Sequence, residues 1–292
     1  MHFIEDGSAA GMLMSELAIT HGKIGKISFV NTTPFYFHLL STSKIPFFVE
    51  GSPAEINELM NQNKIDFAPI SSLEYALHQD QYLLLPNLCI GSRDFSRSVL
   101  LLSKERIAGL EGTKIMLSKK SLSSAALLKI LLKFKHRFTN EFVVGNGTPK
   151  EMLETSDAVL AIGDEALFFK PKEFLYKYDL SELWWNWTEL PFCFAVWAVR
   201  REFYREHPQE VFEFYNKLKE NLQINLQDLE TLLREALNLT VADENFSKVF
   251  GYLFNLNYYL DSEMKKGLEL FYNFAARADL APAVNHISFV EV

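Results

Sequence analysis

Four short segments rich in hydroxyl and amide side chains each follow a predicted strand and precede a predicted helix. A helix N-terminus offers unpaired N–H donors and a partial positive charge, and hydroxyl groups add further donors. Ligands of open α/β sheets bind beyond the carboxyl ends of the strands. For any one segment alone, helix capping is the simpler explanation, but four of them together predict a cleft that binds a carboxylate. The segments are Asn31-Thr32-Thr33, Ser71-Ser72, Ser121-Leu122-Ser123-Ser124 and Gly163-Asp164.

Side chains that could act as a general base are few. His38 falls inside the first predicted helix and His78 follows the Ser71-Ser72 segment, and we favour a structural role for both. Asp164 could take a proton, although a carboxylate at a helix start is more often a cap. The sequence has none of the motifs GxGxxG, GxxxxGK[ST], HExxH or GxSxG, and its 7 histidines show no metal-binding spacing. Nucleotide-binding, zincin and α/β-hydrolase functions therefore lack support.

The elements that must position these residues alternate between strands and helices, which predicts an α/β fold. The motif S/T-P-x-E, which predicts a helix that starts with a capping box, occurs at Ser52 and Thr148. The segment Ser71-Ser72-Leu73-Glu74 predicts a third capping box. From Pro208 onward the chain is mostly helical, with Val211, Phe214, Leu218 and Leu222 on one face and Met264, Leu268, Phe271 and Ala275 on another. Strands are predicted at residues 23–30, 47–49, 67–70, 98–103, 114–118, 141–144, 158–162 and 191–198.

A second strand-helix block, residues 112–192, is inserted between the first block and the helical tail. We therefore expect a smaller lobe of residues 112–192 and a larger lobe of residues 22–111 and 193–292, with separate sheets. This architecture resembles the two-lobed type II periplasmic-binding-protein fold. Interfaces between lobes are preferred ligand sites, and we expect Asn31, Ser71, Ser98, Ser121, Ser123 and Asp164 to face one cavity there. Trp184, Trp185 and Trp187 are expected in the core between the lobes, with an aromatic wall for a ring-shaped ligand as the alternative.

Composition and charge exclude several classes of protein. The chain has 292 residues, 48% of them hydrophobic, and a net charge of −8, which argues against nucleic-acid binding. Cys89 and Cys193 form no CxxC pair, which argues against a disulfide scaffold or a cysteine-rich zinc site. No apolar stretch reaches 18 residues, so no membrane span is predicted. Residues 1–21 lack the pattern of a secretory signal; we interpret them as a disordered leader, and we expect a cytoplasmic protein.

Six segments of the chain are, in order, residues 24–34 (IGKISFVNTTP), 67–75 (FAPISSLEY), 96–103 (SRSVLLLS), 121–124 (SLSS), 162–167 (IGDEAL) and 179–197. Together they resemble the chorismate dehydratases of menaquinone biosynthesis by the futalosine pathway. One such segment would be a weak indication, whereas six in the family's order are specific. The chain departs from the family at Glu189, where glycine is usual, and at Leu122, where many members have a small or polar residue.

The resemblance implies a lyase that removes water from chorismate to give 3-[(1-carboxyvinyl)oxy]benzoate. It implies that Asn31 and Ser98 take part in catalysis and that the reaction requires no metal or redox cofactor, because aromatisation supplies the driving force. An asparagine amide cannot deprotonate carbon, so the substrate's own enolpyruvyl carboxylate is the expected proton acceptor. The expected substrate-binding residues are Thr32, Ser71, Ser72, Ser121, Ser123, Ser124 and Asp164.

Three alternatives stay open at this point. A non-catalytic solute-binding protein shares the fold, but a signal peptide or a lipoprotein cysteine would be expected near its start. The sister lyase of the same pathway also shares the fold and acts on a futalosine-derived substrate. A pyrimidine-precursor synthase is a weaker option, because no histidine lies at a suggestive corner. The sequence leaves the oligomeric state undetermined.

Overall fold

The computed structural model describes residues 20–39, 48–170 and 176–291. Of the leader expected at residues 1–21, residues 1–19 lie outside the described part of the chain. Thr20 and His21 are described, and the backbone amides of His21 and Gly22 donate to the Glu210 carboxylate at 3.2 and 2.8 Å. The expectation of disorder through residue 21 is therefore wrong for its last two residues, because a carboxylate far along the chain holds them.

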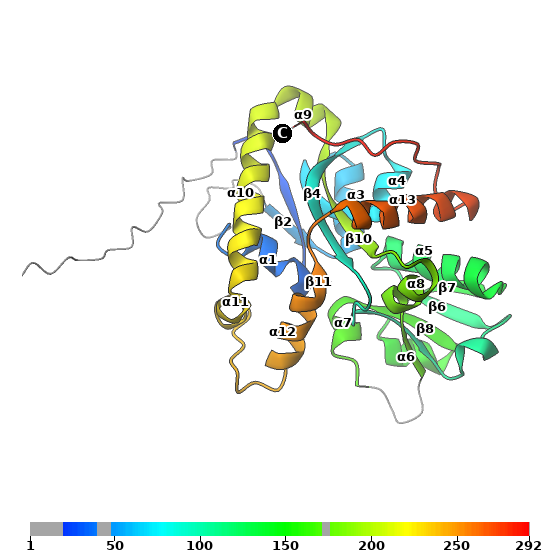
Figure 1. Cartoon of the computed structure of the whole chain (residues 1–292). Helices are drawn as coiled ribbons and strands as arrows, with labels where there is room; N and C mark the ends of the chain where they lie inside the picture. Colours follow the sequence, from blue (N-terminus) through cyan, green and yellow to red (C-terminus); the bar gives the residue numbers. More distant parts are fainter. Residues whose placement is uncertain (1–19, 40–47, 171–175, 292) are drawn as a thin grey trace, which may run out of the picture.

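Two separate sheets define two lobes (Figure 1). The first lobe has a six-stranded sheet in the order β11-β4-β10-β3-β1-β2. Strand β1 pairs with β2 and β3 in parallel, whereas β10 runs antiparallel between β3 and β4. The strands are β1 (Ile24–Ile27), β2 (Phe48–Gly51), β3 (Phe67–Ser71), β4 (Tyr82–Ser92), β10 (Phe192–Arg200) and β11 (Leu256–Asn257).

The second lobe has a five-stranded sheet in the order β7-β6-β8-β5-β9. Strand β5 pairs with β8 from Val99↔Ile162 to Ser103↔Ala158, so it belongs to this sheet. The lobe boundary expected at residue 111 is therefore wrong, because the chain has already crossed before β5. A continuous apolar strand fits either sheet, and only its pairing decides between them. The strands are β5 (Val99–Ser103), β6 (Lys114–Ser118), β7 (Glu141–Gly145), β8 (Ala158–Ile162) and β9 (Tyr176–Asp179).

Helices cover both sheets, as the alternating pattern predicts, and the C-terminal helices complete the first lobe. The faces predicted for the tail are confirmed, since Val211, Phe214, Met264 and Phe271 are all fully buried. Helix α13 contacts α4 of the first lobe and α5 of the second (Figure 1). The helices are α1 (Thr33–Tyr36), α3 (Pro53–Asn61), α4 (Ser72–Leu77), α5 (Leu122–Ile130), α6 (Pro149–Glu154), α7 (Gly163–Leu167), α8 (Leu180–Thr188), α9 (Arg201–Glu206), α10 (Pro208–Gln227), α11 (Leu229–Ala236), α12 (Phe246–Asn255) and α13 (Ser262–Arg277). Every helix in the described ranges is too short or too polar to cross a bilayer.

Two of the three predicted capping boxes are confirmed, at the starts of α3 and α6. The box predicted at Ser71 is wrong, because the Ser71 side chain makes no capping bond to α4. Its Oγ instead accepts a hydrogen bond from Nδ2 of Asn57 at 3.1 Å, and Glu74 turns toward Tyr82. A buried partner on a neighbouring helix thus competes successfully with the local cap.

The first helix ends earlier than predicted. Helix α1 stops at Tyr36, and His38 lies beyond it with φ of 62°. Amide side chains from α10 end the helix by satisfying its carbonyl groups: Nδ2 of Asn221 donates to Phe35 O, and Nδ2 of Asn225 donates to the carbonyls of Pro34 and Phe37. These bonds join segments about 190 residues apart in sequence, so no local pattern predicts them.

Aromatic residues fill the junction between the lobes. Trp184 of α8 is fully buried, and its ring lies 5.6 Å from Phe192 of β10 and 6.1 Å from Phe274 of α13, measured between centroids. Trp187 lies 4.8 Å from Phe274. The expectation that the tryptophans form core between the lobes is confirmed for these two. The edge-to-face packing of Trp184 on Phe192 and Phe274 stabilises the contact beyond the area that it buries.

Glu74 on α4 makes the stability of the fold depend on pH. Burial raises the pKa of this carboxyl from 4.5 to about 7, while its bond from Tyr82 opposes the shift. Because the folded pKa lies above the ordinary value, the carboxylate destabilises the fold increasingly as pH rises from 4.5 to about 7. We expect Glu74→Gln to stabilise the protein by up to about 3 kcal/mol above neutral pH.

The measurement is thermal unfolding of both proteins at about pH 5 and about pH 8. Glutamine keeps an oxygen that accepts from Tyr82 and carries no charge at either pH. The gain in Tm should therefore be largest at the higher pH and shrink at the lower one. An equal gain at both pH values would show that charge is not the cause.

Candidate active site in the interlobe cleft

A cavity lies between the two lobes, at the carboxyl ends of β1, β3 and β8 and at the start of β5. Its empty space, open solvent at the mouth included, is about 570 Å³. Among the described residues that line it, five side chains are polar and none is charged. The described lining residues are Ile27, Phe29, Asn31, Pro53, Ser71, Ile90, Ser98, Val99, Ser121, Ser124, Ile162, Gly163, Phe194, Ala195 and Leu256.

The first lobe contributes Asn31 and Ser71. Asn31 lies in a short 3-10 turn, Val30–Thr32, that follows β1, and its Oδ1 is buried without a hydrogen-bond partner among the described residues. Ser71 ends β3 and is oriented by Asn57 of α3, whose Oδ1 accepts from Ser71 N and whose Nδ2 donates to Ser71 Oγ. With its oxygen accepting from Asn57, the Ser71 hydroxyl can donate its own hydrogen toward a ligand.

The second lobe contributes the N-terminus of α5. Ser121 caps this helix by accepting from Ser124 N at 3.3 Å, and its hydroxyl donates to Ser124 Oγ at 2.8 Å. The Ser124 hydroxyl can then donate into the cavity. Helix N-termini attract anions through their N–H groups and dipole. This end of the cavity therefore favours a carboxylate, even though none of the described lining residues carries a positive charge.

Ser98 lies where the chain enters the second sheet. Its carbonyl accepts from Gly163 N at 2.7 Å, which joins the start of β5 to the end of β8. Gly163 has φ of 60°, and a Cβ there would lie 2.7 Å from the ring of Phe29. Only glycine therefore allows this close approach between the second lobe and the segment before Asn31. Ser98 and Asn31 thus border the same cavity from different lobes.

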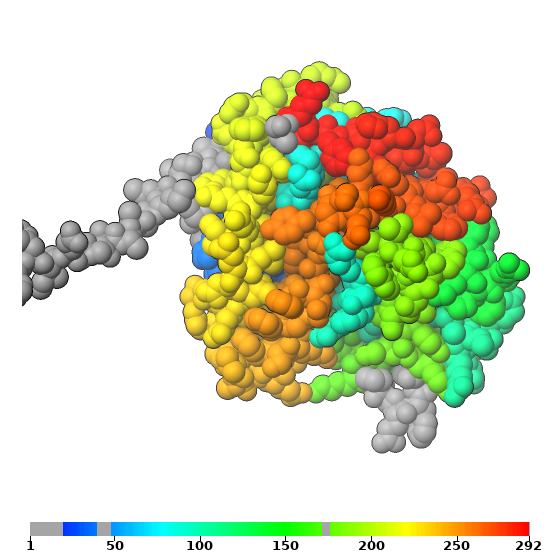
Figure 2. Space-filling view, viewed as in Figure 1, coloured from blue at the N-terminus to red at the C-terminus, as the bar shows by residue number. Residues whose placement is uncertain are grey.

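Asp179 fixes the segment that leads to Ser98, and the sequence patterns assign it no such role. This buried carboxylate accepts from the amides of Ser96 and Arg97 at 2.9 and 2.6 Å, and from the Ser96 hydroxyl at 3.1 Å. It also caps α8 by accepting from Ser181 N. Burial raises the pKa of Asp179, and the four hydrogen bonds oppose that shift. Residues 93–98, which join β4 of the first lobe to β5 of the second, form the crossing segment; in the space-filling view it lies between α12 and the second lobe (Figure 2).

Three of the expected substrate-binding hydroxyls do not line the cavity. Thr32 Oγ1 donates to the carbonyls of Ile27 and Phe29 and so stabilises the turn that carries Asn31. Ser72 Oγ donates to Cys193 O and lies 3.0 Å from Ser123 Oγ, which accepts from Leu73 N. Ser72 and Ser123 therefore form a buried contact between α4 and α5. The expectation that Ser123 faces the cavity is wrong because its hydroxyl is used in this contact.

Asp164 also lies off the cavity lining. It is the second residue of α7, and Ile162, rather than Asp164, holds the cap position. Its Oδ1 accepts from Val30 N at 3.4 Å, so it contacts the turn that carries Asn31. Burial raises the pKa of Asp164 and the Val30 bond opposes this. Both the cap and the cavity-facing position expected for this residue are therefore wrong; its observed contact joins the lobes.

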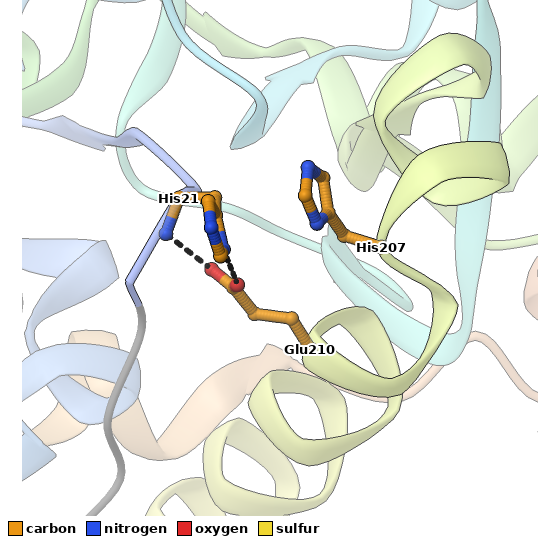
Figure 3. A group of neighbouring side chains, drawn as sticks. All are labelled: His21, His207 and Glu210. Atoms are coloured by element: carbon orange, nitrogen blue, oxygen red, sulfur yellow. Dashed lines mark hydrogen bonds and ion pairs between the residues drawn. The ribbon is translucent and has the colours of Figure 1, made fainter.

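A second group of side chains that could bind a metal lies outside the cavity lining (Figure 3). It consists of His21, His207 and Glu210. Their candidate ligand atoms lie within 4.8 Å of one another, although His21 and His207 have no metal-binding spacing. The two rings stack at 4.4 Å with an angle of 15°, so their nitrogen lone pairs do not converge on one point. Glu210 is occupied by the amides of His21 and Gly22. The group anchors the start of the described chain to α10.

Comparison with known proteins identifies the family. A family model described as menaquinone biosynthesis matches residues 22–277. The chain is 32% identical over 236 residues to the chorismate dehydratase of Thermus thermophilus, covering 75% of this chain and 83% of that protein. The chain belongs to the chorismate dehydratase family of menaquinone biosynthesis. This confirms the resemblance seen in the six sequence segments and makes the protein an enzyme of the dehydratase class.

Solved structures confirm the fold of this family member. Protein AF1704 of Archaeoglobus fulgidus superposes with a TM-score of 0.70 at 16% identity, covering 89% of this chain and 98% of that one. The periplasmic aliphatic sulphonate binding protein SsuA of Escherichia coli gives 0.60 at 15% identity, with coverages of 92% and 94%. At these identities the likeness shows the periplasmic-binding-protein fold and nothing of the ligand.

The two departures from the family pattern do not reach the cavity of this dehydratase. Glu189 ends α8 in the left-handed conformation, with φ of 58°. Glycine favours that conformation at helix C-termini, which explains its use at this position in the family. The Glu189 side chain is exposed. Leu122 is the first residue of α5 and lines an open groove that adjoins the cavity at Ser121.

Proposed function

We propose that the protein removes water from chorismate to give 3-[(1-carboxyvinyl)oxy]benzoate, with the substrate bound in the interlobe cavity. The observation that carries the proposal is the convergence of five uncharged hydrogen-bonding side chains from both lobes on that cavity. Family membership and the chorismate dehydratase of Thermus thermophilus support the substrate. Phe29 and Phe194 offer apolar surface for the substrate ring.

The two carboxylates of chorismate match the donors of the cavity. The hydroxyls of Ser71 and Ser124 and the N-terminus of α5 can each donate to an anion, and they lie in different lobes. Hydrogen bonds to a carboxylate are stronger than those between neutral groups. Uncharged donors hold the anion without an ion pair, so the product carboxylates can leave. We assign Ser71, Ser121 and Ser124 to substrate binding, with Thr32, Ser72, Ser123 and Asp164 supporting the elements that carry them.

The dehydration breaks one ring C–H bond and the C–O bond of the neighbouring hydroxyl, and a ring double bond forms. The proton and the hydroxide leave as water, and the ring becomes aromatic. We assign Asn31 and Ser98 to this step as donors that stabilise the departing hydroxyl, because both border the cavity and neither is a base. The substrate's enolpyruvyl carboxylate takes the ring proton when the enzyme holds it beside that carbon.

The experiment is to incubate the purified protein with chorismate and follow the products by mass spectrometry. We expect a product lighter than chorismate by one water molecule, with the spectrum of a substituted benzoate. Chorismate that binds without turnover would favour a solute-binding protein of the same fold. A protein that leaves chorismate untouched and acts on a futalosine-derived substrate would favour the sister lyase.

A further inference from the structure

The two side chains that we assign to the dehydration belong to different lobes. Asn31 lies in the turn that follows β1 of the first lobe, and Ser98 directly precedes β5 of the second. Two groups that act on one departing hydroxyl need fixed positions, and an error of about 1 Å can cost roughly 100-fold in rate. The reaction therefore depends on the contact that sets the separation of the lobes beside these two residues.

Gly163, at the start of α7 in the second lobe, makes such a contact. Its N–H donates to Ser98 O at 2.7 Å. It also faces the ring of Phe29 from the first lobe, so closely that an added Cβ would lie 2.7 Å from Cε2 and 2.8 Å from Cζ of that ring. Phe29 is half-buried and lines the cavity. One glycine thus joins the backbone beside one reacting side chain to an aromatic ring of the opposite lobe.

The backbone of Phe29 belongs to the turn that carries Asn31. Its carbonyl accepts from the amide of Thr32 at 3.0 Å and from the Thr32 hydroxyl at 2.9 Å. Asp164 of the second lobe accepts from Val30 N at 3.4 Å, which is a second contact between the same two segments. Because these bonds hold the turn together, a displacement of Phe29 relative to the second lobe displaces Asn31 as well.

Two separable features of the structure require glycine at position 163. Its φ is 60°, a conformation in which any Cβ is strained. The Phe29 ring also leaves no room for a side chain. Gly112 of the same lobe has only the first feature, since its φ is 69° and an added Cβ would meet nothing within 4 Å. The two glycines therefore distinguish the contact with Phe29 from backbone strain.

We propose that Phe29 is a positioning residue for the dehydration: the contact of its ring with Gly163 sets the separation of the lobes at the cavity and thereby the position of the Asn31 amide. This inference rests on the proposed function. A side chain at position 163 would displace the ring and the Asn31 turn with it. Loss of the ring would instead remove the contact that holds this turn at a fixed distance from Ser98.

The first test compares Gly163→Ala with Gly112→Ala in chorismate turnover. Both variants place a Cβ at a positive φ, so both should lose some thermal stability, but only Gly163→Ala displaces the Phe29 ring. We expect kcat to fall by about 10-fold to 100-fold in Gly163→Ala and to stay within about two-fold of the wild type in Gly112→Ala. In a Phe29→Ala background the new methyl group has room, so Gly163→Ala should change kcat there by less than about two-fold.

A second cycle leaves position 163 unchanged and so does not depend on the folding of Gly163→Ala. Phe29→Ala removes apolar surface for the substrate ring, which should raise KM whether or not Asn31 is present. Because the Asn31 amide also loses its position, kcat should fall by about 10-fold in the wild-type background and by less than about two-fold in an Asn31→Ala background. Ser72 and Ser123 still join the lobes elsewhere, and thermal unfolding verifies that the variants are folded.

Three results would overturn the inference and leave the proposed function standing. The first is equal kcat in Gly163→Ala and Gly112→Ala. The second is an equal loss for Gly163→Ala with and without the Phe29 ring, which would assign the loss to the backbone at position 163. The third is an equal loss of kcat for Phe29→Ala with and without the Asn31 amide. A wild-type protein without turnover contradicts the proposed function and this inference with it.

Discussion

Replacing Asn31 or Ser98 with alanine is expected to lower kcat for chorismate by about 10²–10³-fold, with KM nearly unchanged. Both side chains border one cavity from opposite lobes, and the backbone bonds beside them, from Thr32 N to Phe29 O and from Gly163 N to Ser98 O, involve neither side chain. A donor that is held toward developing negative charge acts mainly in the transition state, so its removal affects kcat and kcat/KM together. Steady-state kinetics of the two purified variants measure this effect.

Ser156→Ala is the matched control for the serine variant. Ser156 is as deeply buried as Ser98, at 4% exposed, but its hydroxyl donates to Met152 O at the end of α6, outside the cavity lining. Its loss should lower stability slightly and leave kcat intact. A rise in KM with kcat intact for Asn31→Ala or Ser98→Ala would assign these residues to ground-state binding. Wild-type turnover in both variants would refute their catalytic role.

Local sequence patterns could predict much of this fold because its strands and caps obey local rules. The apolar run of β8 and the capping boxes of α3 and α6 need only near neighbours, and all three are observed. The short polar segments after strands follow the same rule: Ser71 ends β3 and Asn31 lies in the turn after β1, so both lie at the carboxyl ends of their strands. The positions of cavity-facing residues thus follow from topology.

The remaining features depend on contacts between distant parts of the chain. The apolar pattern of β5 is compatible with the sheet of either lobe, and only its pairing with β8 assigns it to the second lobe. Ser123 and Ser71 are both serines beside a helix start, yet Ser123 bonds within the lobe junction whereas Ser71 is oriented by Asn57 toward the cavity. Asn57 and Asp179 lie in ordinary helical or strand-end contexts, so no local signal distinguishes them. Only their three-dimensional neighbours do.

Asp179→Ala is expected to destabilise the protein by on the order of 3 kcal/mol, lowering Tm by roughly 6–12 °C. The variant leaves the buried amides of Ser96, Arg97 and Ser181 without their acceptor. Arg97 has φ of 60°, a conformation that such bonds help to maintain. Because Ser98 follows directly, kcat should also fall in the fraction that remains folded. Thermal unfolding and turnover well below Tm measure the two effects.

Asp228→Ala provides the comparison that isolates the crossing segment. Asp228 also caps a helix, accepting from Thr231 N at the start of α11, but it is exposed and has no contact with the cavity lining. Its loss should cost about 1 kcal/mol, as for an ordinary cap, with kcat unchanged. If Asp179→Ala cost no more than Asp228→Ala, the carboxylate would be a helix cap and nothing else. A larger cost together with lower kcat means that one buried acidic side chain both joins β9 to the crossing segment and sets the position from which Ser98 reaches the substrate.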